Sequence, residues 1–243
     1  MTANIGRQQR GQGRRQAHPE RSSEFAADRA EALELTPVSR ETAERLDRFV
    51  ALLLAWQQRV NLIAPSTKAI VWTRHVADSL QLLALAPQAR IWVDLGSGGG
   101  FPGLVIACAL ADVPGAVVHL VESNGKKVAF LREAVRATGA AAVVHAERIE
   151  DFAAKAPKGI EVVTARALAP LATLLKAAYP LLKSGVCGLF PKGQDVASEL
   201  TEAAKYWKIQ ASLIPSRTDP KARIVVVRSV EPQSRPARTR DSG

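Results

Sequence analysis

Alternating strand-like and helical segments are the feature of this sequence that most restricts its fold. From residue 91 onward, short runs rich in Val, Ile and Leu are each followed by a segment with apolar residues at helical spacing. Such alternation predicts βαβ units, and therefore an α/β fold with a mostly parallel sheet. The expected strand and helix pairs are Ile91–Asp94 with Pro102–Ala111, Val117–Glu122 with Lys126–Thr138, Ala142–His145 with Arg148–Ala154, Ile160–Ala165 with Leu171–Leu182, and Val186–Phe190 with Asp195–Tyr206.

The two ends of this region follow a different pattern. Two strand-like runs, Trp207–Leu213 and Arg223–Val230, are joined by a turn-rich linker with no helical segment between them, so we expect them to pair as an antiparallel edge. Ahead of the sheet, apolar residues recur at helical spacing after Ser39 and again over Thr73–Leu85. These spacings predict two helices, the first with Ser39 as its N-cap.

Composition and charge divide the chain further. Residues 1–38 and 232–243 hold too few apolar residues to repay the entropy of ordering, so we expect a disordered basic arm and a disordered basic tail. Between them we expect an N-terminal helical segment at 39–88 and a core at 89–231. The formal charge is +10, and the two ends carry more than half of the excess. This imbalance favours a polyanionic partner, although basic tails can also serve only solubility.

Cysteine usage and hydropathy indicate the compartment. Cys108 and Cys187 lie in apolar runs without metal-ligand spacing, so we expect neither a metal site nor a disulfide framework. The longest uninterrupted apolar stretch, residues 104–111, is too short to span a bilayer, and the first residues lack the apolar core of a secretion signal. We therefore expect a cytoplasmic protein that does not enter a membrane.

A glycine-rich loop, VDLGSGGGFPG, follows the first expected strand. Gly98, Gly100 and Gly103 satisfy GxGxxG, which makes a nicotinamide dinucleotide a formal candidate. The carboxylate of Asp94 would repel a pyrophosphate bound at this loop, whereas it would attract a ligand with positive charge. S-adenosylmethionine carries an ammonium and a sulfonium and no phosphate, so it fits the loop better, with Gly96 and Gly98 allowing close backbone approach.

The next two strands supply further candidate cofactor-binding residues. Glu122 ends the second strand, where an acidic side chain can accept hydrogen bonds from both ribose hydroxyls of an adenosine cofactor. Ile149 and Glu150 follow the third strand, where an adenine ring can rest on an apolar side chain. These residues support an adenosine ligand without distinguishing S-adenosylmethionine from NAD(P).

Several motifs together resemble one known family. They are VDLGSGGGFPG, ESNGKKVAFLREA from Glu122, TARALAPL from Thr164, Lys192-Gly193, and NLIA with RHVADSL from Asn61 and Arg74. In this combination and order they resemble the RsmG family, also called glucose-inhibited division protein B, from about Leu46 to Val227. The resemblance implies a class I S-adenosylmethionine-dependent methyltransferase fold, Rossmann-like, with an N-terminal helical extension. It further implies methyl transfer to guanine N7 in the 530 loop of bacterial 16S rRNA, and cofactor contacts at Gly96, Phe101, Ile149, Glu150 and Arg166.

The chemistry of guanine N7 agrees with what the sequence lacks. N7 carries an in-plane lone pair and no proton, so its attack on a methyl group needs no general base. TARALAP occupies the end of the fourth strand, where methyltransferases acting on exocyclic amines hold an Asp/Asn-Pro-Pro-Tyr/Phe motif. We expect Arg166, in that segment, to position the substrate, with a structural salt bridge as the alternative.

Other polar residues are candidates for RNA contact. His75 lies three residues before Asp78 and four before Ser79, so the three share one helical face, either facing RNA or packing the helix. Lys126, Lys127 and Lys192 are candidate phosphate contacts.

We expect a monomer that acts on 16S rRNA, a small ribosomal subunit or an assembly intermediate. The alternatives are an NAD(P)-linked Rossmann oxidoreductase and a non-catalytic RNA-binding ribosome-assembly factor.

Overall fold

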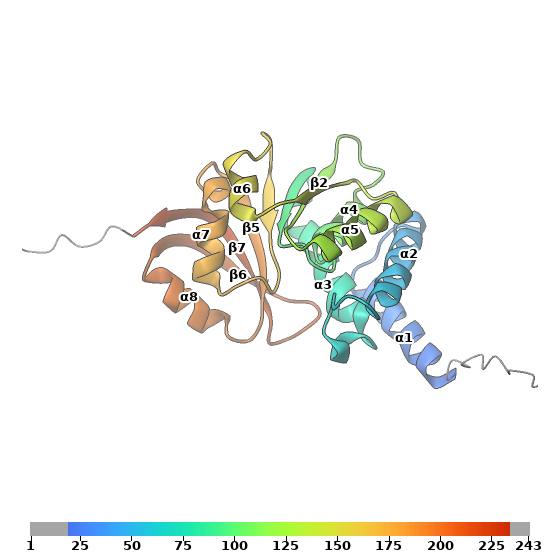
Figure 1. Ribbon diagram of the computed structural model, residues 1–243. Helices are drawn as coiled ribbons and strands as arrows, with labels where there is room; N and C mark the ends of the chain where they lie inside the picture. The colour runs from blue at the N-terminus through green and yellow to red at the C-terminus, as the bar shows by residue number, and fades with distance from the viewer. Residues whose placement is uncertain (1–18, 234–243) are drawn as a thin grey trace, which may run out of the picture.

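The fold is built on one seven-stranded sheet with the strand order β3-β2-β1-β4-β5-β7-β6. The computed structural model describes residues 19–233 (Figure 1). Neighbouring strands from β3 to β5 pair in parallel, while β7 pairs antiparallel with β5 and with β6, which confirms the predicted antiparallel edge. The strands are β1 Ile91–Leu95, β2 Val117–Glu122, β3 Ala142–Ala146, β4 Val162–Thr164, β5 Cys187–Lys192, β6 Trp207–Pro215 and β7 Arg223–Pro232.

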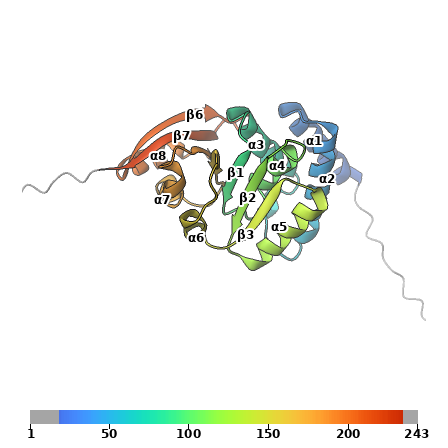
Figure 2. The same cartoon turned by 90° about the horizontal axis from the view of Figure 1, so that it is seen from above.

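Helices cover both faces of this sheet, and each face has its own apolar core. One core joins the sheet to the N-terminal helices, α4 and α5, and the other joins it to α6, α7 and α8. The view from above shows these two layers on either side of the strands (Figure 2). The helices after β1 are α4 Gly103–Ala109, α5 Gly125–Thr138, α6 Ile149–Ala154, α7 Leu171–Leu182 and α8 Val196–Ala204.

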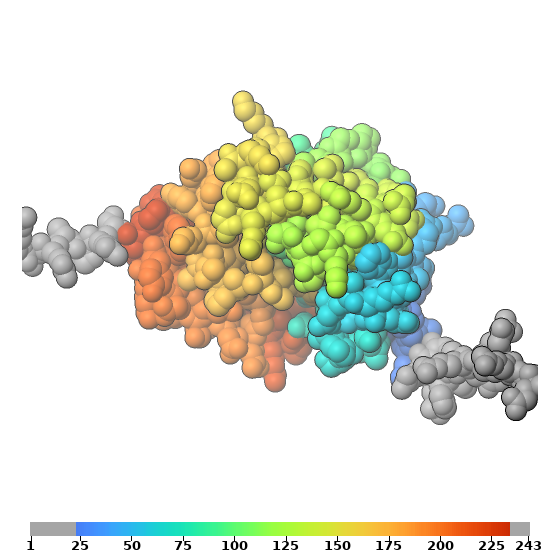
Figure 3. All heavy atoms as spheres, in the orientation of Figure 1, coloured from blue at the N-terminus to red at the C-terminus, as the bar shows by residue number. Residues whose placement is uncertain are grey.

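Local signals in the sequence set several helix ends. The hydroxyl of Ser39 accepts the N–H of Thr42 at 3.1 Å and begins α2, Arg40–Trp56, as the sequence predicted. Helix α5 begins after Asn124, whose side chain accepts two backbone N–H groups, and it ends at Gly139 in the left-handed conformation. Helices α2 and α5 pack against one another, and in Figure 3 the light-blue and green parts of the surface adjoin.

The prediction of a disordered arm through residue 38 is wrong for its second half. Residues Pro19–Leu35 form helix α1, and Ala32 on this helix is fully buried in the core. The carboxylate of Asp28 accepts the backbone N–H groups of Trp72 and Thr73 at 2.8 and 3.0 Å. Helix α1 docks through hydrogen bonds as well as apolar contacts. A low content of apolar residues therefore did not show that this segment is ordered. Residues 1–18 and most of the predicted C-terminal tail lie outside the described residues.

The second predicted helix is irregular. It is helical over all of its predicted length but consists of a π-helical turn, η2 Trp72–Ala77, followed by α3 Asp78–Leu80 and the 3₁₀ turn η3 Gln81–Leu85. A short 3₁₀ turn, η1 Pro65–Thr67, precedes it. Irregular helical turns of this kind are frequent at functional sites. His75 and Asp78 of this one bind Arg166, just after β4. Among residues 19–233, no helix has the length and apolarity needed to cross a bilayer.

Candidate cofactor and substrate groove

Three adjoining cavities lie at the carboxyl ends of the parallel strands, and Arg166 and Ala167 line all of them. The β2 cavity, of about 300 Å³, contains Glu122 and Ile149 in its wall. The loop cavity, of about 350 Å³, is bounded by the glycine-rich loop and His75. The β5 cavity, of about 540 Å³, is lined by the end of β5 and adjoins the other two at Arg166 and Ala167. Open α/β sheets bind ligands in this position, where β1 and β4 diverge toward opposite sides.

Two positions of the glycine-rich loop that face these cavities have a backbone conformation that favours glycine. Gly96 has a φ of +70° and Gly98 a φ of +53°, values that L side chains rarely adopt. A Cβ atom on Gly96 would lie 2.7 Å from Cδ1 of Leu168, whose side chain stands between the β2 and β5 cavities. The loop therefore brings bare backbone to the wall of the groove.

Glu122 is fixed by the backbone around it. Its Oε2 accepts the N–H of Gly98 at 3.0 Å, and its Oε1 accepts the N–H of Asn124 at 2.8 Å. The residue is 9% exposed, and that remnant faces the β2 cavity. Each oxygen keeps a second lone pair for a ligand hydroxyl. Ile149 and Glu150, in the first turn of α6, line the same cavity, so an oriented carboxylate and an apolar side chain suit an adenosine moiety.

Asp94 does not stand where the sequence predicted. It is 0% exposed and lies behind the loop, where its Oδ2 accepts the N–H of Gly103 at the start of α4 at 3.1 Å. It lines none of the three cavities. Burial raises the pKa of Asp94 to about 7, which weakens its negative charge at neutral pH. The sequence predicted that Asp94 contacts the cofactor directly. In the structure its carboxyl group instead binds the N-terminus of α4 and supports the glycine-rich loop from behind.

Arg166 is held in a cage on the irregular helix. Its Nη1 donates to Oδ2 of Asp78 at 3.0 Å and to the backbone oxygen of Arg74 at 3.0 Å, and its Nη2 donates to Nδ1 of His75. The guanidinium carbon also lies 5.3 Å from the ring centre of Phe101. Of the two alternatives from the sequence, substrate positioning and a structural salt bridge, the salt bridge with Asp78 is present, and Arg166 also lines all three cavities.

His75 is a neutral part of this cage. Because Arg166 donates to Nδ1, the Nε2 atom carries the proton and donates to Oγ1 of Thr67 at 2.8 Å. Burial lowers the pKa of His75 to about 3, with the positive charges of Arg166 and Arg74 adding to the effect. Ser79 is buried and donates to the backbone oxygen of His75 at 2.6 Å, so it packs the helix and does not face the groove.

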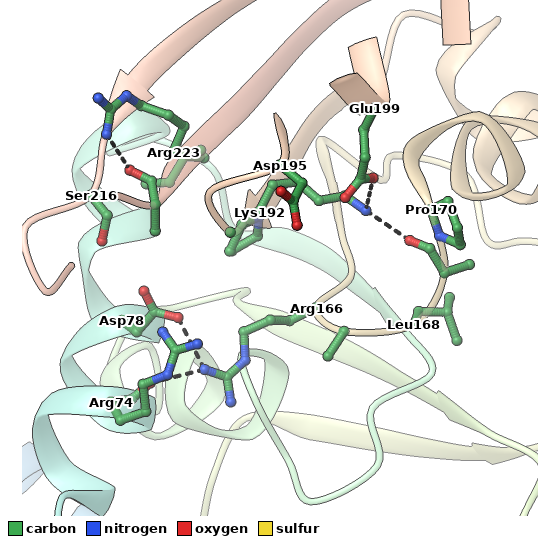
Figure 4. Close-up of a pocket in the computed structure, with 16 residues that line it drawn as sticks. Arg74, Asp78, Arg166, Leu168, Pro170, Lys192, Asp195, Glu199, Ser216 and Arg223 are labelled. Atoms are coloured by element: carbon green, nitrogen blue, oxygen red, sulfur yellow. Dashed lines mark hydrogen bonds and ion pairs between the residues drawn. The ribbon is translucent and has the colours of Figure 1, made fainter. Parts of the chain in front are cut away.

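A second ionic cluster holds the segment after β4. The ammonium of Lys192 donates to the backbone oxygen of Ala169 and to Glu199, both at 2.7 Å (Figure 4). Glu199 also accepts the N–H of Leu171 at 2.6 Å. Ala167, in the same segment, has a φ of +52°, which a non-glycine residue adopts only when its surroundings impose it. Sequence analysis missed Glu199 and Ala167, because neither position belongs to a recognisable pattern.

The predicted phosphate contacts occupy different environments. Lys192 has a side chain only 10% exposed and is paired in the wall of the β5 cavity, which differs from the exposed rim expected from the sequence. Lys127 is half-buried beside Gly98 and lines both the β2 and the loop cavity, whereas Lys126 is exposed. No group of His, Cys, Asp and Glu within residues 19–233 has the arrangement of a metal site.

The sheet order, the glycine-rich loop after β1 and the acidic end of β2 define a class I S-adenosylmethionine-dependent methyltransferase. Solved structures with the same fold include an O-methyltransferase from Bacillus cereus in complex with SAH, with a TM-score of 0.56 and 14% identity over 86% of this chain and 100% of that chain. A putative O-methyltransferase from Klebsiella pneumoniae has a TM-score of 0.55 and 12% identity over 86% of this chain and 99% of that chain.

Sequence comparison identifies the family within this class. The sequence model of the family described as rRNA small subunit methyltransferase G matches residues 42–224. The chain belongs to that family. A ribosomal RNA small subunit methyltransferase G from Bradyrhizobium sp. (strain BTAi1) is 61% identical over 86% of this chain and 95% of the relative. Another, from Nitrobacter hamburgensis, is 60% identical over 87% of this chain and 81% of the relative. The predicted resemblance is confirmed.

Proposed function

We propose that this enzyme transfers a methyl group from S-adenosylmethionine to N7 of a guanine in the 530 loop of bacterial 16S rRNA. Membership of the rRNA small subunit methyltransferase G family supports this substrate. The observation that carries the proposal is that two cavities of the groove meet at Arg166 and Ala167. The β2 cavity, with its oriented Glu122, meets the β5 cavity at Arg166 and Ala167, so a cofactor in one and an RNA base in the other would meet there.

We assign the cofactor to the β2 and loop cavities. Glu122 would accept hydrogen bonds from the ribose hydroxyls, and Ile149 would pack against the adenine, with Glu150 beside it in the same cavity. The backbone of Gly96 and Gly98 would approach the remaining part of the cofactor, with Phe101 and Arg166 also in the wall of the loop cavity. When bound, S-adenosylmethionine supplies an electrophilic methyl group on a positively charged sulfur.

The same contacts argue against NAD(P). The N–H of Gly98, one of the loop groups that a pyrophosphate would use, is already donated to Glu122.

We assign Arg166 to positioning the guanine rather than to moving a proton. Guanine N7 needs no general base, so catalysis rests on aligning N7 with the methyl group and the sulfur. A bare positive charge beside a sulfonium would be unfavourable, and the contact of Arg166 with Asp78 at 3.0 Å neutralises it. A guanidinium has five N–H donors, and the cage uses three, which leaves two for the oxygen O6 beside N7.

Basic residues near the groove suit contact with RNA phosphates. Arg74 lines both the loop and the β5 cavity and has a side chain 43% exposed, while Lys126 and Lys127 lie in the first turn of α5. We infer that the protein acts as a monomer in the cytoplasm, on 16S rRNA, the small subunit or an assembly intermediate.

Arg166→Ala tests the assignment of the groove. We expect the single-turnover rate of methyl transfer to fall by more than about 100-fold, while calorimetric affinity for S-adenosylmethionine changes little. Arg132→Ala, which removes an exposed cation from α5, is the matched control and should transfer methyl normally. RNA with 7-deazaguanosine at the target position lacks N7 and should accept no methyl group. Transfer to that RNA, or a normal rate for Arg166→Ala, would overturn the assignment. Absence of any transfer by the wild-type enzyme would favour a non-catalytic RNA-binding factor.

A further inference from the structure

The β5 cavity has two facing polar walls (Figure 4). One wall carries Asp78 and Arg166, and the other carries Lys192, Asp195 and Glu199 at the carboxyl end of β5 and the start of α8. Apolar side chains close the cavity on the side of the β4–α7 segment, where Leu168 is 39% exposed. Its volume of about 540 Å³ lies in the range of small-molecule sites, large enough for one nucleobase.

The acidic side chains of this cavity are not equivalent. Asp78 accepts from Gln81 and Thr218 through Oδ1 and from Arg166 through Oδ2, so both of its oxygens are engaged. Glu199 binds Lys192 and the start of α7. The carboxylate of Asp195 makes no hydrogen bond or ion pair with any residue in the range 19–233. In Figure 4 it points toward the open centre of the cavity, across from Arg166.

Neighbouring cations do not neutralise Asp195. Lys192, on the same wall, is committed to Glu199 and to the backbone oxygen of Ala169. Arg223, which also lines the cavity, donates to the backbone oxygens of Pro220 and Ala222. The guanidinium of Arg166 is committed to Asp78 on the opposite wall. Of the carboxylates that line the cavity, the exposed one of Asp195 therefore keeps its oxygens free, within residues 19–233, to accept from whatever enters. A carboxylate in this situation suits a ligand that offers two adjacent N–H donors.

Guanine has that pair of donors on the edge away from its methylated atom. N1–H and the exocyclic N2 amino group form a donor pair on the Watson–Crick edge, while N7 and O6 lie toward the other side of the base. We propose that Asp195 recognises the target guanine in the β5 cavity by accepting hydrogen bonds from N1–H and N2–H. This inference rests on the proposed function, since it assumes that the base in the cavity is the methyl acceptor.

The arrangement accounts for selection of guanine against adenine. With N7 turned toward the junction of the cavities at Arg166, the Watson–Crick edge faces the opposite wall, where Asp195 lies. The two N–H groups left on Arg166 face O6, which adenine lacks. Adenine also presents a lone pair at N1, which the carboxylate of Asp195 would repel. Adenine would therefore lose the hydrogen bonds that guanine makes and would also be repelled. The target must leave its stack to enter, as single-stranded loops permit.

Removing one donor from the RNA and the acceptor from the protein tests this pairing. The substrates are 16S rRNA molecules with either guanosine or inosine at the target position, given as free RNA and assembled into small subunits. Inosine lacks only the N2 amino group. The enzymes are wild type, Asp195→Ala and the control Glu202→Ala, which removes an exposed carboxylate from the same helix outside the cavity.

We expect wild type and Glu202→Ala to prefer guanosine by about 10- to 100-fold in kcat/KM, the usual discrimination of a good bidentate contact. Asp195→Ala should lose activity on guanosine and show almost no preference, with unchanged calorimetric affinity for S-adenosylmethionine. A variant with lost structure would instead lose cofactor affinity and lower both substrates equally, keeping the preference. A preserved preference in Asp195→Ala, or none in wild type, would overturn the inference while leaving the proposed function intact. No methylation of guanosine by wild type in either form of the substrate would overturn both.

Discussion

Gly96→Ala is the most direct perturbation of the groove, because the structure gives its consequence at atomic level. The new methyl group would lie 2.7 Å from Cδ1 of Leu168, closer than real Cβ atoms approach other atoms, and the φ of +70° would be imposed on a non-glycine residue. The left-handed conformation costs about 1–2 kcal/mol in an L residue. Leu168 must rotate away, and the spaces open to it are the β2 and β5 cavities that it lines.

Two separate effects follow, and a matched control distinguishes them. Gly115 has a φ of +76° with nothing within 4 Å of its would-be Cβ atom, so Gly115→Ala carries the conformational cost without the clash. We expect both variants to lose about 1–2 kcal/mol of unfolding free energy in urea. Only Gly96→Ala should also lose cofactor affinity in calorimetry, by about tenfold, which corresponds to about 1.4 kcal/mol.

A double variant separates the clash with Leu168 from the cost of the φ angle. In Gly96→Ala with Leu168→Ala the side chain that must move is absent, so cofactor affinity should return to that of Leu168→Ala alone, while the loss of unfolding free energy from the φ angle remains. If the double variant binds no better than Gly96→Ala, or if Gly115→Ala weakens binding equally, displacement of Leu168 is not the cause.

The remaining predictions concern the N-terminal helix, the histidine in the cage and the basic arm. Asp28→Ala leaves the start of η2 without its acceptors and should reduce the unfolding free energy by about 2–3 kcal/mol, whereas Glu31→Ala, exposed on the same helix, should change it little; equal losses in urea unfolding would contradict the docking role. His75 has its pKa lowered to about 3 against 6.5 when unfolded, so the unfolded chain takes up more protons between these values. The unfolding free energy of wild type relative to His75→Gln should therefore fall by about 1.4 kcal/mol per pH unit as the pH drops from about 6 toward 4, and a pH-independent difference would disprove burial of a neutral imidazole. Deleting residues 2–18, which contain four Arg and no acidic residue, should weaken RNA binding and reduce the slope of log affinity against log salt by about 0.7–0.9 per lost phosphate contact; an identical slope would make this stretch a solvated extension.

Local sequence patterns were sufficient for the sheet and its glycine-rich loop. The alternating apolar periods predicted the strands, the helices between them and the antiparallel pairing of β6 and β7, because each pattern reports burial within a few residues. Capping at Ser39 and the loop from Gly96 were also local, since one side chain or one φ angle decides them. The family motifs gave the class of enzyme for the same reason.

Contacts between distant segments were decided only by the tertiary structure. Asp28 caps a turn more than forty residues away, which turned a polar stretch into helix α1. The cage of Arg166 joins residues about ninety positions apart, and Lys192 and Glu199 hold a segment from the preceding βαβ unit. Asp94 was assigned to the cofactor because a sequence shows that a carboxylate follows a strand, but not which side of the loop it faces. Burial, pairing and pKa depend on which elements pack together, so the division of acidic residues into supports such as Asp94 and free acceptors such as Asp195 was settled by the fold.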